Sequence, residues 1–205
     1  MERVGAGVAR RLFDIVASAA ALVALSPLLA AIAVVVKASS PGPALFRQAR
    51  LGKDERLFQI YKFRTMVAGA ESGSPITVNG DRRITRVGRV LRRFDLDELP
   101  TLFNVLRGDM TIVGPRPELP VYLPNYSREQ RRVFSVRPGL TDPATLAFRD
   151  ESRQLNGASV EEVYIHEILP QKLALNLAYL KARSVRSDAA IMLRTVAAML
   201  FRPKS

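Results

Sequence analysis

The sequence predicts a mostly α-helical fold of the α+β class that contains one small β-hairpin. The first observation is a long apolar stretch, residues 15–36, with a helix-breaking pair in its middle. The second is a pair of later segments that place apolar residues at helical spacing among arginines and lysines. The third is a short segment that alternates apolar and basic residues around a turn. We therefore expect a helix-break-helix at the N-terminus, followed by amphipathic helices around a compact polar domain.

Composition limits the size and the partners of the protein. Its 205 residues suffice for one domain with a hydrophobic core, but not comfortably for two. The net charge of +12 indicates an anionic partner, which is nucleic acid, acidic lipid or a phosphorylated substrate. The lack of Cys excludes disulfides, thiolate metal sites and a Cys nucleophile. The single histidine, His166, excludes multi-histidine metal sites, and we interpret it as a surface or packed residue of a helix.

The apolar stretch carries no charge and, as one helix, would measure roughly 33 Å, enough to cross a bilayer. Ser26 and Pro27 stand at its midpoint, where proline removes a backbone donor and predicts a bend. Basic residues flank both ends, which favours two cytoplasmic ends under the positive-inside rule. The residues alone leave a kinked spanning helix and a re-entrant hairpin as open interpretations. A cleaved signal peptide fits less well, because the stretch is long and lacks a clear small-residue cleavage site.

A strong stop follows at residues 39–43, SSPGP, and separates the apolar segment from the polar part of the chain. Residues 1–40 and 41–205 are therefore the two expected units. Leu45–Arg50 and Arg56–Met66 alternate apolar and basic residues and predict the two strands of a hairpin. Residues 69–80, rich in Gly, Ser, Pro and Asn, predict a loop.

Two basic amphipathic helices are predicted in the polar part. Residues 84–94, ITRVGRVLRRF, have the pattern either of a helix in an anionic interface or of a solvated helix. Residues 171–201 predict a second helix of the interfacial type. Four prolines between Gly114 and Tyr126 exclude a long helix there.

The most informative stretch is the acid pair Asp97-Glu98, which precedes a predicted helix that ends at Gly108. Asp97 then stands at or near the N-cap, and capping alone would explain one acid. Two acids beside the positive end of a helix can also hold Mg²⁺. Since arginines bind phosphate by paired hydrogen bonds and a carboxylate can attack phosphorus, a surrounding excess of arginines indicates a phosphoryl-transfer site. Those arginines are Arg92, Arg93, Arg116, Arg137 and Arg149.

Several strings together resemble one family in its order along nearly the whole chain. They are SPGPALFRQARLG (40–52), KFRTM (62–66), DRRITRVGRVLRRFDLDELPTLFNVLRGDMTIVGPRPE (81–118), RPGLT (137–141) and ILPQKLALNLAYL (168–180). In these strings the chain resembles the bacterial sugar transferases, also called monotopic polyprenol-phosphate phosphoglycosyl transferases, in their small, minimal form.

The resemblance implies roles for individual residues. Residues 15–36 correspond to a re-entrant membrane hairpin broken at Ser26-Pro27. Asp97 corresponds to the nucleophile, Glu98 to its catalytic partner, and both to the acids associated with a Mg²⁺ cofactor. The implied substrate-binding residues are Arg92, Arg116, Arg137, Arg149, Lys62 and Arg64.

The resemblance also implies an activity and a place in the cell. A catalytic domain, residues 41–205, would lie on the cytoplasmic face of the inner membrane and contact its phospholipids. It would transfer a sugar 1-phosphate from a UDP-sugar to polyprenol (undecaprenyl) phosphate, with release of UMP, through a phosphosugar-aspartyl intermediate. That reaction would be the first membrane step of glycoconjugate or exopolysaccharide assembly. Nucleic acid is not an expected partner, and a homodimer is left open.

One loop departs from the family pattern. After RPGLT the pattern has Gly, an apolar or aromatic residue, then Ala-Gln, whereas this chain has Asp142-Pro143-Ala144-Thr145. The departure puts nucleotide or sugar contacts of this loop in question.

Two functions of other classes remain as alternatives: a membrane-tethered nucleic-acid-binding protein and a non-catalytic scaffold. Neither explains the adjacent acids within an arginine cluster.

Overall fold

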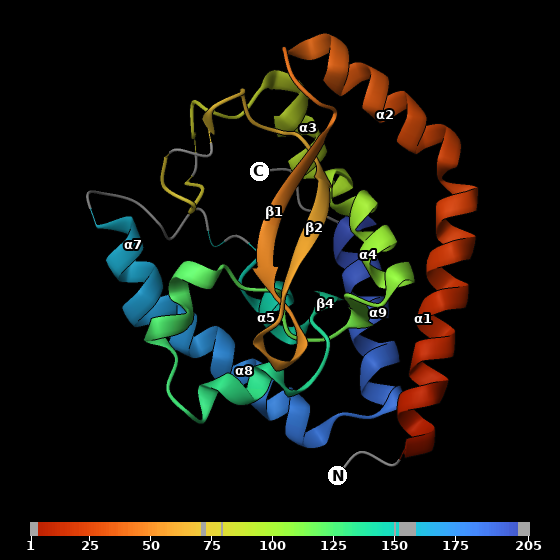
Figure 1. The fold of residues 1–205 in the computed structure, drawn as a ribbon, viewed down its shortest axis with the longest axis vertical. Helices are drawn as coiled ribbons and strands as arrows, with labels where there is room; N and C mark the ends of the chain where they lie inside the picture. Colours follow the sequence, from red (N-terminus) through yellow and green to blue (C-terminus); the bar gives the residue numbers. More distant parts are fainter. Residues whose placement is uncertain (1–3, 71–72, 79, 150, 152–158, 201–205) are drawn as a thin grey trace.

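The computed structural model is mainly helical and has one central β-hairpin (Figure 1). The hairpin pairs β1 (Leu45–Leu51) with β2 (Leu57–Phe63) in antiparallel order, around the short helical turn η1 (Lys53–Glu55). The predicted mostly α fold with a small hairpin is therefore confirmed. The second strand ends earlier than expected, at Phe63, and Met66 forms only an isolated bridge to Ile84. The structure describes residues 4–70, 73–78, 80–149, 151 and 159–200.

The other elements range from short helical turns to helices of 14 to 21 residues. They are α1 (Val4–Ala24), α2 (Ser26–Ser39), α3 (Arg86–Arg93), η3 (Leu96–Thr101), α4 (Leu102–Arg107), β3 (Thr111–Val113), η4 (Pro120–Asn125), η5 (Gln130–Ser135), β4 (Gly139–Thr141), α5 (Pro143–Ala147), α7 (Val160–Val163), η6 (Tyr164–Ile168), α8 (Leu169–Ala182) and α9 (Val185–Leu200).

The N-terminal apolar segment forms α1 and α2, which are bent by 63° relative to each other. The bend lies where Ser26-Pro27 predicts it. Pro27 occupies the first turn of α2, where proline is favoured because the amides of that turn have no partner within the helix. The Ser26 hydroxyl donates to the Val23 carbonyl over 2.8 Å, in place of the amide that proline lacks. Within the described residues no single helix is long and apolar enough to cross a membrane. The bent pair of α1 and α2 has that length and apolarity only when both helices are taken together.

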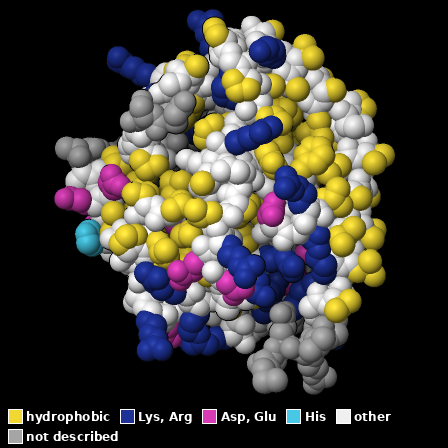
Figure 2. Space-filling view, in the orientation of Figure 1, with side chains coloured by type: hydrophobic (Ala, Val, Ile, Leu, Met, Phe, Trp, Pro, Cys, Tyr) yellow, Lys and Arg dark blue, Asp and Glu magenta, His cyan; other side chains and the backbone are white. Residues whose placement is uncertain are grey.

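The first half of α1 is fixed to the rest of the protein by polar contacts. Arg11 donates to the carbonyls of Val105 and Leu106 over 2.6 and 2.9 Å, at the end of α4. The buried Asp14 carboxylate accepts from the Thr111 hydroxyl over 2.7 Å and from the Ile112 amide over 3.1 Å. Because these side chains bond the inner face, α1 turns its apolar residues outward, and apolar atoms line that edge of the molecule in Figure 2.

The predicted single helix over residues 171–201 is wrong, because the structure has two helices, α8 and α9. The chain breaks at Arg183, whose ψ of 125° is not helical. Ser184 and Ser187 then cap α9 reciprocally: each hydroxyl accepts from the other's backbone amide, over 3.1 and 2.9 Å. The two serines thus satisfy free amides at the start of α9. Phe201, the predicted end, lies outside the described residues.

Two features of the fold were not predicted. A parallel pair joins β3 to β4, with Thr111 opposite Gly139, but each strand is too short to show an alternating pattern. Between α7 and α8 the chain makes the π-helical turn η6, which precedes Pro170. Since proline has no amide to donate to the preceding turn, the wider turn is a local response to it.

Buried apolar residues form separate clusters, two of which matter for the site. The α8 cluster packs α8 against η4 and η5, with Tyr122, Tyr164 and Leu173 among its members. The α9 cluster packs α9 against β3, with Ile191 and Val113 at its centre. Helix α5 contacts both α8 and α9 and therefore lies between the two clusters.

Candidate active site

The acid pair lies in the first turn of η3, which is fixed against β2. The Thr101 hydroxyl donates to the Tyr61 carbonyl over 3.0 Å. The fully buried Asn104 accepts from the Tyr61 amide over 3.0 Å and donates to the Gln59 carbonyl over 2.7 Å. These side chains satisfy the open edge of β2, which in a two-stranded sheet has no neighbouring strand. The same bonds hold Glu98 close to Lys62, the next residue of β2 after Tyr61.

Asp97 lies near the N-cap of the helix, as predicted, two residues after the N-cap residue itself. Asp95 occupies the N-cap position in a left-handed conformation, with φ of 54°, and makes no side-chain cap hydrogen bond. Asp97 lies near the N-cap but inside the first turn, as does Glu98. Capping therefore does not account for the Asp97 carboxylate.

Glu98 is held by two cations. The Lys62 ammonium lies 2.7 Å from Oε1, and both terminal nitrogens of Arg116 donate to the carboxylate. Burial alone would raise the pKa of Glu98, but Arg116 and Lys62 lower the pKa well below its usual range. Burial also lowers the pKa of Lys62, although Glu98 opposes that effect. Glu98 is therefore a permanently charged anchor for Lys62 and Arg116.

Asp97 has a different environment. Its side chain is only 9% exposed, and it forms no hydrogen bond or ion pair with another described residue. Burial, and then the neighbouring charge of Glu98, raise the pKa of Asp97 to about 6, while Lys62 and Arg92 oppose the shift. At neutral pH Asp97 is an ionised carboxylate that no partner in the described protein neutralises by contact. Such a group suits attack on an electrophile or binding of a cation.

Arg92 comes to this region from α3. Its Nε donates to the Thr65 hydroxyl over 2.8 Å, and burial lowers its pKa while the charge of Asp97 opposes that shift. Gly88 permits this arrangement, because a Cβ there would stand 2.0 Å from the Thr65 carbonyl oxygen. Helix α3 can therefore approach the chain at Thr65 closely enough to bring a buried guanidinium within electrostatic reach of Asp97.

A cavity of about 620 Å³ opens beside the acid pair. Glu98 and Arg116 line it, together with Asp95 and Arg149, which form an ion pair of 3.0 Å with each other. Asp97 is not among the lining residues, although its neighbours Asp95 and Glu98 are. The cavity therefore reaches the acid pair from the Glu98 side.

Arg50 of β1 lines the same cavity and was not predicted as a site residue. Its guanidinium donates to the Pro117 carbonyl over 3.1 Å and to the Gln48 side chain over 2.7 Å, and its buried Nε has no partner. Burial lowers the pKa of Arg50, while Glu118 opposes that effect. No described carboxylate lies within ion-pair distance of this buried cation. In the sequence it stands only within the string SPGPALFRQARLG (40–52).

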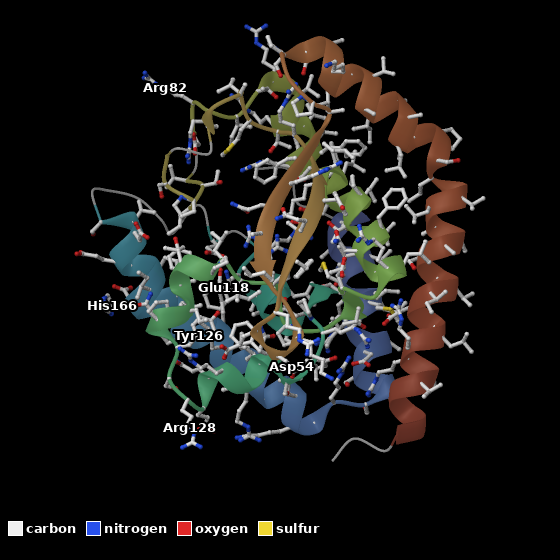
Figure 3. The ribbon with its side chains drawn as sticks, viewed as in Figure 1. Asp54, Arg82, Glu118, Tyr126, Arg128 and His166 are labelled. Atoms are coloured by element: carbon white, nitrogen blue, oxygen red, sulfur yellow. The ribbon has the colours of Figure 1, made fainter. Side chains whose placement is uncertain are left out.

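Glu118 and two tyrosines form a further group that sequence reasoning missed; Glu118 and one of the tyrosines, Tyr126, are labelled in Figure 3. The Glu118 carboxylate accepts from the Tyr164 hydroxyl over 2.9 Å and from the Tyr126 hydroxyl over 3.4 Å. Burial, and then Glu118, raises the pKa of both tyrosines above its usual range. The Lys172 ammonium stands 5.2 Å from the centre of the Tyr164 ring. Glu118, Tyr164 and Lys172 all line the cavity, whereas His166 is exposed at the outer edge, as its interpretation as a surface residue predicts.

The structure brings together some of the predicted substrate-binding residues and not others. Lys62, Arg92, Arg116 and Arg149 surround the acid pair or line the cavity. Arg64 instead donates to the carbonyls of Pro41 and Ser40 over 2.8 and 2.7 Å, and so holds the end of α2.

Arg137 also lies away from the cavity. Its Nε donates to the Gly108 carbonyl over 2.8 Å, just past the end of α4. Gly108 itself takes a left-handed conformation, with φ of 98°, as a helix-ending glycine does. Arg137 therefore bonds the helix terminus that the sequence predicts.

The departure from the family pattern has a structural explanation. The buried Asp142 caps α5: its Oδ1 accepts from the amides of Ala144 and Thr145 over 2.7 and 3.0 Å. Pro143 occupies the first helical turn, where proline is favoured. Because Asp142 starts α5 at this point, Thr145 and Leu146 line the cavity.

Taken together, a buried unpaired carboxylate, an acid clamped by two cations and an arginine-lined cavity define an enzyme site for phosphorylated substrates. The family model of the bacterial sugar transferases matches residues 5–202, and the chain belongs to that family.

Three curated relatives show what this chain is similar to. It is 42% identical over 205 residues to "UDP-glucose:undecaprenyl-phosphate glucose-1-phosphate transferase" of Caulobacter vibrioides, which covers 98% of this chain and 73% of the relative. It is 46% identical over 138 residues to "UDP-N-acetylgalactosamine-undecaprenyl-phosphate N-acetylgalactosaminephosphotransferase" of Aeromonas hydrophila, over 64% of this chain and 32% of the relative. It is 37% identical over 205 residues to "Exopolysaccharide production protein PSS" of Rhizobium leguminosarum, over 96% of this chain and 98% of the relative. The chain thus spans only about a third of the length of some relatives and nearly all of another.

Proposed function

We propose that the protein transfers a sugar 1-phosphate from a UDP-sugar to a polyprenyl phosphate, with undecaprenyl phosphate as the acceptor. The names of the Caulobacter and Aeromonas relatives support both substrates. The observation that carries the proposal is the Asp97 carboxylate, which is buried, without a partner in the described protein, and adjacent to an acid that fixes two cations.

The reaction runs in two displacements at one phosphorus atom. An Asp97 oxygen attacks the β-phosphorus of the UDP-sugar and forms an acyl-phosphate bond, while the bond from that phosphorus to the bridging oxygen breaks. That oxygen leaves with the electron pair as part of UMP. A phosphate oxygen of the acceptor then attacks the same phosphorus, the carboxylate of Asp97 leaves, and polyprenyl diphosphate-sugar is formed.

The surrounding residues have distinct tasks in this scheme. Glu98 orients Lys62 and Arg116, because it fixes both by ion pairs of its own. Arg116 and Arg50 line the cavity and offer positive charge to the diphosphate. Arg149 also lines the cavity and can bind the diphosphate while it keeps its ion pair with Asp95. The partly buried positions of these guanidinium groups strengthen each contact, since water screens them less than at an open surface.

A Mg²⁺ ion is part of the proposal. The described residues contain no group of three His, Cys, Asp or Glu side chains that could hold a metal by themselves. The chemistry still fits, because Mg²⁺ in phosphoryl-transfer sites is held by one or two carboxylates together with substrate phosphates. Asp97 would hold it, with Glu98 beside it, and the ion would supply positive charge to the diphosphate.

We also propose that the site works at the cytoplasmic face of the inner membrane, with α1 and α2 as a re-entrant hairpin in one leaflet. The bend of 63° and the outward apolar side chains, such as Val8, Val23 and Val34, support this placement. A hairpin in one leaflet would hold the acid pair at the depth of a lipid phosphate group. The proposed place in the cell is the first membrane step of glycoconjugate assembly.

The purified protein should release UMP from a UDP-sugar when undecaprenyl phosphate and Mg²⁺ are present. A screen that includes UDP-glucose and UDP-N-acetylgalactosamine, measured by UMP release, identifies the donor. Asp97→Asn should abolish both turnover and a phosphosugar adduct trapped with labelled donor. Asp54→Asn is the matched control, because Asp54 is exposed and its left-handed conformation suits Asn equally.

The alternatives make different predictions in the same assays. A scaffold or a nucleic-acid-binding protein would release no UMP with any donor, and the latter would bind DNA or RNA in a salt-sensitive manner. Wild-type turnover in Asp97→Asn would remove Asp97 from the role of nucleophile.

A further inference from the structure

The cavity beside the acid pair has two chemically different ends. At one end its walls come from the α8 cluster, and at the other from the α9 cluster, with α5 between them. Residues that line the cavity and belong to or pack on the α8 cluster are Ile76, Leu119, Tyr122, Phe148 and Tyr164, and those on the α9 cluster are Ile112, Leu146 and Met192.

The α8 end carries charged groups as well as aromatic rings. Arg50, Glu118 and Lys172 line the cavity there, and Glu118 is bonded to Tyr164. Lys172 also forms an ion pair of 2.6 Å with Glu151. A ligand in this end meets positively and negatively charged hydrogen-bonding groups next to flat aromatic rings.

The α9 end is apolar. Helix α9 contributes Met192, Thr195, Val196, Ala198 and Met199, and none of these side chains is charged. Val196 both lines the cavity and is 53% exposed, so the cavity opens outward at this helix. Leu193, on the same helix, is 72% exposed and extends the apolar surface beyond the opening.

We propose that the α9 end binds the first isoprene units of the polyprenyl phosphate acceptor, an inference that rests on the proposed function. The acceptor is an anion joined to a long hydrocarbon chain, so its site needs cations beside an apolar channel that opens to the outside. The cavity combines these surfaces, because Arg116 lines it together with Leu102, Ile112 and the α9 side chains. A UDP-sugar is polar along its whole length and suits the charged α8 end instead. Each end thus accepts one of the two substrates.

A pair of matched substitutions on α9 tests this assignment. Ala198→Trp fills the lining of the cavity, whereas Ala197→Trp places the same ring on the exposed side of the helix, at a residue that does not line the cavity. Both variants are compared with the wild-type protein in the same detergent. The first measurement is the single-turnover burst of UMP from the UDP-sugar without acceptor, and the second is the KM for undecaprenyl phosphate.

Ala198→Trp should keep the burst of UMP and raise the KM for the acceptor by about tenfold, the effect of losing the burial of roughly two methylene groups. Ala197→Trp should leave both quantities at their wild-type values. Equal acceptor KM values in the two variants would overturn the subsite, and so would a change in the donor KM as large as the change in the acceptor KM. Absence of the burst in the wild-type protein would overturn the proposed function itself, which separates that failure from failure of the subsite.

A second pair covers the case in which Ala198→Trp loses the burst through misfolding. Val196→Asp puts a charge at the mouth of the cavity, and Leu193→Asp puts one on a more exposed residue of the same helix outside the lining. Val196→Asp should raise the acceptor KM several-fold more than Leu193→Asp does. Equal effects of the two would show that only the outer surface of α9 matters and would overturn the subsite.

Discussion

The arginines at the ends of helices α2 and α4 differ from those at the acid pair in where they lie. At the helix ends, Arg64 and Arg137 donate to backbone carbonyls and do not line the cavity. Arg50 also donates to a backbone carbonyl, and its buried Nε lacks a partner, as does the Nε of Arg64. Arg50 nevertheless lines the cavity beside the acid pair, where Asp97 has no partner among the described residues. The position of an arginine relative to the cavity, rather than its unpaired atoms, therefore indicates whether it supports the fold or binds substrate.

The sharpest test of this comparison removes Arg116, the cation that both holds Glu98 and lines the cavity. Arg116→Gln takes away the paired hydrogen bonds to Glu98 and a cation of the cavity wall. We expect kcat/KM for the UDP-sugar to fall by roughly a thousandfold, as for the loss of a main electrostatic contact to the transition state. Steady-state UMP release measures it. Arg132→Gln, which changes an exposed arginine, is the control, and equal activity of both variants would contradict the assignment.

The buried, unpaired Asp97 carboxylate should lower the free energy of unfolding at neutral pH, and its replacement by a neutral residue should raise it again. The pKa of Asp97 in the folded protein is about 6, above its ordinary value of 3.8. The folded protein therefore holds that proton more tightly than the unfolded chain, so the free energy of unfolding falls as pH rises from about 4 to about 6 and stays lower above.

Asp97→Asn removes this pH dependence. In metal-free buffer at pH 8 it should raise the free energy of unfolding by up to about 3 kcal/mol, the equivalent of roughly two pKa units. Below pH 4 the two proteins should be nearly equally stable. Thermal unfolding followed by circular dichroism at both pH values checks the sign, and a variant less stable than wild type at pH 8 would refute it.

Arg64 should behave in the opposite way. Arg64→Gln leaves the carbonyls of Pro41 and Ser40, at the end of α2, without their charged donor. We expect the free energy of unfolding to fall by about 2 kcal/mol, because hydrogen bonds to charged groups are worth more than neutral ones. The KM for the UDP-sugar should stay unchanged. A raised KM with unchanged stability would move Arg64 into the substrate site.

The smallest expected effect is that of Arg50. Arg50→Gln removes a buried cation with an unpaired Nε, so we expect stability to stay the same or rise slightly. The KM for the UDP-sugar should increase by about tenfold, the value of one charge-assisted contact to phosphate. Thermal unfolding and UMP release measured on one preparation separate the two effects. Lost stability without a change in KM would place Arg50 among the structural arginines.

Sequence patterns identified the elements that rest on local signals. Alternation identified the hairpin, Pro27 located the bend, and Gly108 marked the end of α4. The acid pair, with Lys62 and Arg116 beside it, came from the resemblance and from residue chemistry. The structure brings these groups together as expected.

The misses concern contacts between distant parts of the chain. Arg50 and Glu118 meet in one cavity across the fold, and no local pattern marks either of them. The resemblance implied that Arg64 and Arg137 bind substrate, and it did not show that both donate to backbone carbonyls in this fold. The break between α8 and α9 was missed because apolar periodicity continues through it, while two serines supply the cap.

The π-helical turn η6 makes this part of the chain tolerant of the loss of one residue. The turn holds one residue more than a regular helical turn would, and it links Tyr164, bonded to Glu118, to the helix that carries Lys172. Removal of Ile165 would let a regular helix form, in which four residues cover roughly the same rotation as the five residues of the π-helical turn. Lys172 would then stay beside the Tyr164 ring and the cavity. The wide turn thus absorbs a change of one residue in length without changing which face of α8 lines the cavity.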